Sequence, residues 1–364
     1  MIELFTITSA IISFLSITGI IKSRIIIFWF LVILLLMFDG LRWEMGTDWN
    51  SYYNIFLLAD TYVEMGKPPG FEYGYIYYNS LIRFFTDNYS YFLFITTAFI
   101  YIGIFFVVAK ITNYSLLSLF YLFGTLPWYS GSLRQMMASV FFVFAIKAII
   151  DRKIYIFFAC IIAGAFFHNS IVVFIPIYIL YGLSTTTLVF IYGFLVIISV
   201  YSRQLVYILD YLLSVYTDRT YSHRIGGTLA QSNPTLGMAR KILTLIGVYF
   251  FAYRALYVKN INPYCWDKIR LLLFLVSLSP ILYYIGIYHV SHVSSRLDIY
   301  ISILSLAMLI GVLDTTFKTV VNRMLLFLFV IALIAVFYYR LGWMSLFHPY
   351  SSIFYNFDLH RELF

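Results

Sequence analysis

The sequence predicts an all-α polytopic membrane protein, and three observations support this fold class. The chain of 364 residues is 62% hydrophobic and only 11% charged, which is too apolar for a soluble domain. Apolar runs of about 15–20 residues recur from end to end, close to the length needed to cross a bilayer as a helix. The runs are continuous, as in 25–38 and 325–337, and they lack the alternation of an outer-membrane β-barrel.

Ten apolar segments have the length and composition of membrane spans. They lie at about 3–21, 25–40, 90–109, 114–130, 132–150, 188–202, 242–258, 269–288, 297–313 and 320–340. Residues 154–180 allow two interpretations: a short paired hairpin with His168 near its tip, or one long helix with 188–202 at the interface. Two limbs of ~13 residues would each rise only ~20 Å, less than the ~30 Å hydrocarbon core. We therefore expect about 10–12 transmembrane helices in one integral membrane domain, 1–364.

Two segments between spans, at about 41–89 and 203–241, are too long to be simple turns. Both mix aromatic with polar residues, and Pro68-Pro69-Gly70 interrupts the first. This composition is typical of re-entrant or interfacial helices. We expect both segments to be outer loops that carry such helices.

Lysine and arginine distribute differently across these spans. Seven of the nine lysines fall on one side, which the positive-inside rule identifies as the inner side, with both termini outside. Ten of the fifteen arginines and all six histidines fall on the outer side. Guanidinium forms a bidentate fork with phosphate, whereas ammonium acts as a point charge. The pattern therefore indicates an outer anion site, with pyrophosphate favoured; the alternative is that arginines snorkel to both headgroup layers.

A group of charged and aromatic residues follows the second span. It contains Arg42, Asp48, Trp49 and Tyr52. Aromatic faces can stack on sugar rings while carboxylates accept hydrogen bonds from hydroxyls, so the group suits a glycan. The alternative is an interfacial aromatic belt followed by a capped helix start.

Four more residues could carry chemistry in the first half of the chain. Glu72, in the same outer loop, is a carboxylate that could act as a base. Arg134 and Gln135 open the span at 132–150, where a helix N-terminus and a cation together can hold phosphate oxygens. His168 has the side chain suited to proton transfer near neutral pH. The alternatives are a solvated carboxylate, interface anchors and a buried structural histidine.

A last cluster runs from His289 to Tyr300. His292, Arg296 and Tyr300 follow one another at intervals of four and share one face of a helix. Arginine on that face would repel a metal ion, so anion or hydroxyl binding fits better. We expect no metal, no cofactor and, because no basic stripe is present, no nucleic-acid partner. The chain also lacks nucleotide-binding motifs, so a membrane-borne activated donor must supply the energy for any transfer.

Five short motifs occur in a fixed order along the chain. They are Arg42…Gly46-Thr47-Asp48…Tyr52, Glu72-Tyr73-Gly74-Tyr75, Leu133-Arg134-Gln135, Phe167-His168-Asn169-Ser170…Pro176 and Arg296…Tyr300. Over roughly residues 40–300 they resemble the EpsG-like branch of Wzy-type polysaccharide polymerases. The resemblance implies a multi-pass enzyme of the bacterial inner membrane whose active site faces the periplasm or outside. It would polymerise O-antigen or exopolysaccharide repeat units, as in lipopolysaccharide biosynthesis, carried on undecaprenyl pyrophosphate.

The resulting hypothesis is a metal-independent glycosyltransferase with a lipid-linked donor and a lipid-linked acceptor, and with a chain-length regulator as a further partner. Arg134 and Arg296, helped by Arg42, would bind the pyrophosphate. His168, Asp48 or Glu72 would accept the proton of the acceptor hydroxyl. The rival arrangement is a divalent ion bound at Asp48. Two alternatives stay open: a lipid-linked oligosaccharide flippase and a membrane O-acyltransferase of surface glycans.

Overall fold

The structure is a computed structural model that describes residues 2–21, 23–45, 48–201, 204, 234–257, 262–288 and 296–341. These residues form helices and contain no strand, which confirms the all-α prediction. Two compact units emerge: Met1–Tyr178 with Lys318–Phe364, and Ile179–Phe317. The single domain expected from the sequence stays a prediction.

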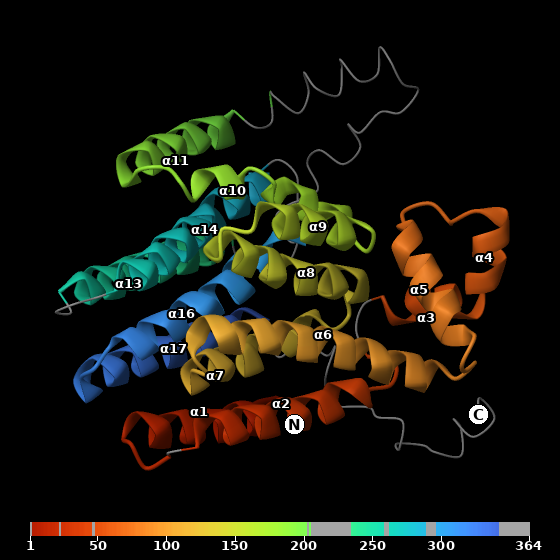
Figure 1. Cartoon of the computed structure of the whole chain (residues 1–364), viewed down its shortest axis with the longest axis horizontal. Helices are drawn as coiled ribbons and strands as arrows, with labels where there is room; N and C mark the ends of the chain where they lie inside the picture. Colours follow the sequence, from red (N-terminus) through yellow and green to blue (C-terminus); the bar gives the residue numbers. More distant parts are fainter. Residues whose placement is uncertain are drawn as a thin grey trace. The chain divides into compact units, whose positions relative to one another are not determined.

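The first unit contains most of the predicted spans and the first long outer loop (Figure 1). Its helices are α1 (Ile2–Ile17), α2 (Arg24–Gly40), α3 (Trp49–Leu57), α4 (Ala59–Met65), α5 (Tyr73–Arg83), α6 (Tyr89–Thr112), α7 (Leu116–Thr125), η1 (Leu126–Tyr129), α8 (Leu133–Ile150), α9 (Ile154–Ala165), η2 (Asn169–Phe174), α10 (Ile177–Leu180, which runs across the unit boundary) and α17 (Val320–Leu341). Each of the six spans predicted here contains at least one of these helices.

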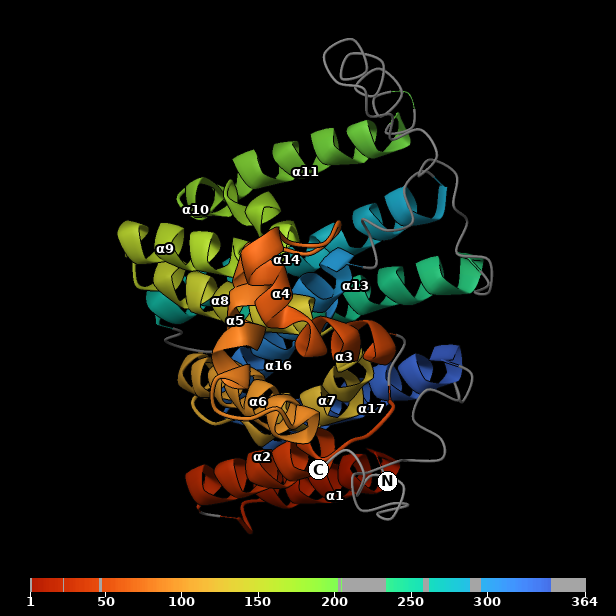
Figure 2. The ribbon, with the colours of Figure 1, turned by 90° about the vertical axis from the view of Figure 1, so that its right-hand side faces the viewer.

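Neighbouring apolar helices pack in pairs to build the core of this unit. The extensive contacts are those of α1 with α7, α2 with α6, and α8 with both α6 and α9; Figure 2 shows α1 and α2 side by side. Local capping fixes where α6 begins and ends. The Asn88 side chain accepts a hydrogen bond from the Ser90 amide at 2.8 Å, and Asn113 ends the helix in the left-handed conformation (φ 49°).

The first outer loop is helical over much of its length, as predicted. Helix α5 packs against both α3 and α4, and the three gather beside the start of α6 (Figures 1 and 2). The side chains of Tyr52, on α3, and Tyr75, on α5, are both buried and contact each other. This arrangement places the loop that precedes α5 close to the first turn of α8.

The ambiguous segment 154–180 is a hairpin, so the alternative of one long helix is wrong. Helix α9 ends at Ala165, the chain turns at Phe166–His168, and η2 packs back against α9. Phe157, near the start of α9, meets Tyr178, near the end of the return limb, with ring centroids 5.2 Å apart. The twelve residues of α9 rise about 18 Å, too little to cross the bilayer.

The second unit contains α11 (Thr185–Val200), α13 (Pro234–Leu256), α14 (Pro263–Tyr288), the π-helix η4 (Ile299–Ser305) and α16 (Leu306–Thr316). Here α14 packs against α11, α13, η4 and α16. The outer loop predicted to run to about residue 241 stays a prediction. Helix α13 begins at Pro234, so Lys241 lies inside a helix, where its side chain is buried against Asp298.

Five helices are long and apolar enough to cross a membrane in the part of the chain that the structure describes. They are Tyr89–Thr112, Leu133–Ile150, Pro263–Ile285, Arg296–Thr316 and Val320–Tyr338. Five more apolar helices have 10–17 residues. The protein is therefore a polytopic helical membrane protein.

Candidate functional site

The site is built where the loop before α5 approaches the first turn of α8. Pro68 and Pro69 restrict the chain, and Gly70 follows with φ +83°, a conformation that residues with side chains rarely adopt. This turn aims the Gly70 carbonyl at Arg134, whose Nη1 donates a hydrogen bond to it at 2.6 Å. The backbone carbonyl of Gly70 therefore helps to fix the orientation of the Arg134 guanidinium group.

Glu72 and the Phe71 ring complete that orientation. Arg134 Nη1 lies 2.5 Å from Glu72 Oε2, and both side chains are 14% exposed. The guanidinium carbon lies 4.2 Å from the centroid of the Phe71 ring, a distance at which a cation and a ring attract each other. The bonds to Gly70 and Glu72 both come from Nη1, while Nε is buried without a hydrogen-bond partner among the described residues. The guanidinium therefore retains donor capacity for an anionic group.

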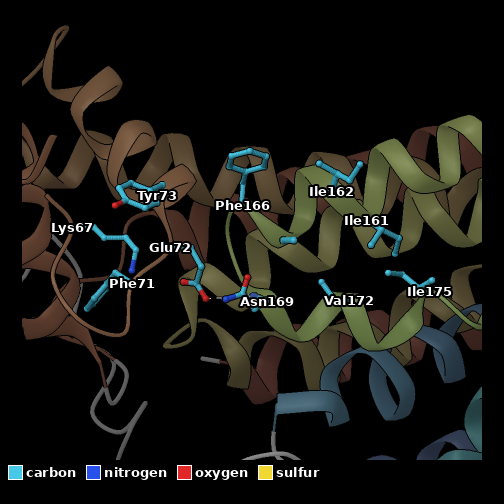
Figure 3. Close-up of a pocket in the computed structure, with 11 residues that line it drawn as sticks. Lys67, Phe71, Glu72, Tyr73, Ile161, Ile162, Phe166, Asn169, Val172 and Ile175 are labelled. Carbon is cyan, nitrogen blue, oxygen red and sulfur yellow. Dashed lines mark hydrogen bonds between the residues drawn. The ribbon is translucent and has the colours of Figure 1, made fainter. Parts of the chain in front are cut away.

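Glu72 also connects this loop to the α9–η2 hairpin. Its second oxygen, Oε1, accepts a hydrogen bond from the backbone N–H of Asn169 at 3.4 Å (Figure 3). Glu72 immediately precedes α5, a position at which the helix dipole stabilises a negative charge. One carboxylate therefore links three elements: α5, α8 and the start of η2.

His168 lies beside this contact and caps η2. Its Nδ1 accepts a hydrogen bond from the Ser170 amide at 3.2 Å and lies 2.7 Å from Ser170 Oγ. The side chain is buried. Because Nδ1 acts as an acceptor, the neutral ring carries its proton on Nε2. Neither ring nitrogen of His168 then has a free lone pair to accept a proton, because Nδ1 accepts the Ser170 hydrogen bond and Nε2 carries the proton. This geometry favours a capping role for His168 over a role as a base.

Tyr52 belongs to the same group of residues. It is buried, and its ring centroid lies 6.4 Å from that of Phe71 and 5.6 Å from that of Tyr75. Burial raises the pKa of Tyr52, and the positive charge of Arg134 opposes that rise. The hydroxyl therefore remains protonated at neutral pH.

Trp49 and Asp48 lie one turn earlier, at the start of α3. Trp49 is 8% exposed, and Tyr53 stacks on it with ring centroids 5.1 Å apart. Tyr89 contacts it edge-on. This packing leaves little of the indole for a sugar. Asp48 is exposed at the helix start and its side chain makes no capping hydrogen bond, and Gln135 is buried in the first turn of α8.

Arg42 lies in a separate, buried ion pair. Its Nη1 is 3.3 Å from Asp39 Oδ2, with side chains 3% and 4% exposed. Nη1 donates to the Asp39 carbonyl at 2.6 Å and Nη2 to the Ser130 carbonyl at 3.2 Å. Asp39 Oδ2 also accepts hydrogen bonds from Tyr101 and Ser130. Asp39 was not predicted from the sequence, although a carboxylate inside an apolar span is a recognisable signal.

The second unit holds the remaining predicted residues. Arg296 is exposed and Tyr300 is fully buried in η4; His292 lies outside the described residues. A polar chain in this unit was not predicted: Lys241 pairs with Asp298 and donates to Ser302, which contacts Ser279 at 2.8 Å. The sequence signal that could have indicated this polar chain was Lys241 itself, one of only two lysines predicted to lie on the outer side.

A pocket of about 420 Å³ opens beside Glu72 (Figure 3). Polar residues at one end are Lys67, Glu72, Tyr73 and Asn169, together with Phe71. The hairpin supplies the apolar wall at the other end: Ile161, Ile162, Ala165, Phe166, Val172 and Ile175. The sequence suggested Glu72, but not that it would lie at the boundary between a charged region and an aliphatic one.

Gly74 lets α5 approach the hairpin tip closely. A Cβ at this position would lie 2.6 Å from both Cβ and the carbonyl oxygen of Phe166. We expect Gly74→Ala to separate α5 from the hairpin and to destabilise the protein by about 1–3 kcal/mol, as overpacking does.

Gly193→Ala is the matched control, because Gly193 lies in α11 and a Cβ added there would meet nothing within 4 Å. It should leave thermal stability unchanged or raise it, since alanine favours helix. Thermal unfolding of both purified variants in detergent provides the measurement. Equal midpoints for Gly74→Ala and the unmodified protein would contradict the close contact.

The fold and site define a class: a multi-pass α-helical membrane protein with an ion-paired arginine beside a pocket that is polar at one end and aliphatic at the other. Its sequence matches the model of the EpsG family over residues 25–352. The chain belongs to the EpsG family. No curated protein and no solved structure matched the chain. Membership of this family supports a general role as a polysaccharide polymerase of the glycosyltransferase kind.

Proposed function

We propose that the protein polymerises a surface polysaccharide by moving the growing glycan from undecaprenyl pyrophosphate to the next lipid-linked repeat unit, on the outer face of the bacterial inner membrane. The observation that supports this most directly is the ion pair of Arg134 with Glu72, whose carboxylate lines the polar end of the pocket. A pyrophosphate leaving group needs a cation, and an acceptor hydroxyl needs a base. The pair supplies one of each.

The proposed reaction exchanges one bond at the anomeric carbon. The acceptor hydroxyl oxygen attacks that carbon, the bond between the carbon and the pyrophosphate oxygen breaks, and the hydroxyl proton passes to a carboxylate. The lipid pyrophosphate leaves with the electron pair. Arg134 would stabilise the negative charge that develops on it, with Nε as a donor that no described residue engages.

Of the three bases suggested by the sequence, Glu72 is supported best. It lines the pocket, and its Oε1 has a second lone pair beyond the one that accepts the long hydrogen bond from the Asn169 backbone amide. The single lone pair of His168 Nδ1 already accepts a hydrogen bond, and neither His168 nor Asp48 lines the pocket. Glu72 thus serves two purposes: it orients Arg134 through Oε2 and accepts the proton through Oε1.

The test is a gel of surface polysaccharide from the source strain with and without this gene. Loss of the gene should collapse the ladder of chain lengths to a single repeat unit, because units still cross the membrane but are not joined. Complementation with the unmodified gene should restore the ladder. Loss of even the single unit would indicate a flippase instead, and an unchanged ladder with altered substituents would indicate an acyltransferase.

A further inference from the structure

We propose that Tyr52 is a positioning residue that holds the Arg134 guanidinium in one orientation by two routes, the first through its hydroxyl and the second through its ring. This inference rests on the proposed function and deepens it, because it adds a side chain of α3 to the groups that control Arg134. Tyr52 would act on the reaction through Arg134 and not by contact with the substrate.

The first route is a hydrogen bond between the Arg134 guanidinium and the Tyr52 hydroxyl. A guanidinium group has no acceptor, so the tyrosine oxygen accepts this bond. The Tyr52 side chain is buried, and a hydrogen bond with a charged partner is stronger where water does not compete for it. The bond ties the first turn of α8 to α3.

The second route passes through the ring of Phe71. The Tyr52 and Phe71 rings are almost perpendicular, at 88°, with centroids 6.4 Å apart, a favourable arrangement for two aromatic rings. Phe71 in turn has the guanidinium carbon of Arg134 at 4.2 Å from its centroid. Tyr75 stacks on Phe71 with centroids 6.1 Å apart. The packed rings therefore fix the plane against which the guanidinium lies.

The contacts of the loop alone do not fix that plane. Gly70 and Glu72 both bind Nη1 of Arg134, so by themselves they anchor one corner of the guanidinium and let it pivot. A long arginine side chain loses rotamer freedom when it is held in one geometry. Contacts that order it before the substrate binds reduce the cost of ordering it later. Tyr52 supplies such contacts.

Burial separates this role from direct contact with a ligand. Tyr52 is 4% exposed, so little of its surface is left for a sugar or a phosphate, although the sequence groups it with residues suited to a glycan. Its hydroxyl and its ring both lead to Arg134. A change at Tyr52 should therefore alter the reaction only as far as it alters the guanidinium.

Kinetics of the full-length protein in nanodiscs test the assignment, with lipid-linked repeat units extracted from the gene-deletion strain as substrate. Tyr52→Phe removes the hydroxyl and keeps the ring. It should lower kcat roughly tenfold and leave KM within about twofold, because the guanidinium then stabilises the developing charge less well. A raised KM with unchanged kcat would place Tyr52 in substrate contact and overturn the proposal, as would unchanged kinetics.

Tyr53→Phe is the matched control. Tyr53 is the next residue of α3, and its ring contacts Trp49 and Tyr89 rather than Phe71. The same loss of a hydroxyl should there leave kcat unchanged. If Tyr53→Phe lowers kcat as much as Tyr52→Phe does, the loss is not specific to Arg134 and the proposal fails.

A double-mutant cycle with Arg134→Lys distinguishes positioning from a general structural role. Tyr52→Phe should add little to the loss of about 100-fold that Arg134→Lys causes, because the group through which it acts is already gone. Independent effects would multiply to about 1,000-fold, and that result would overturn the proposal. Unfolding midpoints identify a variant that fails to fold. If Tyr52→Phe is such a variant, Phe71→Leu takes its place in the cycle, with rescue expected from Phe71→Tyr.

Arginine NMR separates this inference from the proposed function. The guanidinium signals of Arg134, identified by their absence in Arg134→Lys, should move in Tyr52→Phe and stay in place in Tyr53→Phe. If they do so but the gene is not needed for chain extension, the positioning role stands and the polymerase function fails. If chain extension needs the gene while Tyr52→Phe changes neither the signals nor kcat, the polymerase function stands and the positioning role fails.

Discussion

Replacing Arg134 with lysine should reduce polymerisation about 100-fold or more, although the positive charge is retained. The guanidinium holds the Gly70 carbonyl and Glu72 with Nη1 and keeps Nε for a further group. An ammonium group has no planar fork, so it cannot bind the loop and the pyrophosphate in the same arrangement. The readout is the chain-length distribution in the gene-deletion strain complemented with each variant.

Two further variants sharpen this result. Arg83→Lys is the control, because Arg83 pairs with Asp60 and Asp87 rather than with Glu72, and it should give the unmodified ladder. Arg296→Lys asks whether the second predicted arginine also binds phosphate. Wild-type polymer length for both Arg134→Lys and Arg296→Lys would refute the phosphate-binding hypothesis.

Arg42→Met should destabilise the protein by about 3–5 kcal/mol, because it leaves Asp39 charged and buried without its cation. Adding Asp39→Asn should recover most of that loss. The amide oxygen can still accept the hydrogen bonds that Tyr101 and Ser130 now give to Asp39. Thermal unfolding in detergent of the single and double variants measures the recovery.

The same double variant decides between two roles for Arg42. If Arg42 only stabilises the helices, the double variant should both fold and restore the polysaccharide ladder. A double variant that is stable but gives no ladder would place Arg42 in substrate binding, as the sequence suggested.

Hydropathy was sufficient to predict the helices, because a continuous apolar segment needs the same internal backbone hydrogen bonding whatever it packs against. The burial of Lys241 in α13 was not predicted, because a buried lysine needs an anionic partner and its partner Asp298 lies 57 residues away. Sequence alone cannot show such a partner.

The sequence predicted several residues of the candidate site, but it did not predict which of them contact each other. Glu72 and Arg134 were each identified from local context, but their pairing joins residues 62 positions apart and depends on the Gly70 turn. Arg42 is also paired with a carboxylate, but with one three residues earlier, and its side chain is 3% exposed against 14% for Arg134. The difference between the two arginines lies in their neighbours.

The hairpin of α9 and η2 also affects how membrane crossings are counted. Because Phe157 and Tyr178 meet, the chain leaves this segment at the end where it entered. The segment therefore contributes no net crossing, and adding or removing it would leave the sidedness of every later helix unchanged. Topology reporters placed just before α9 and just after Tyr178 should consequently report the same compartment.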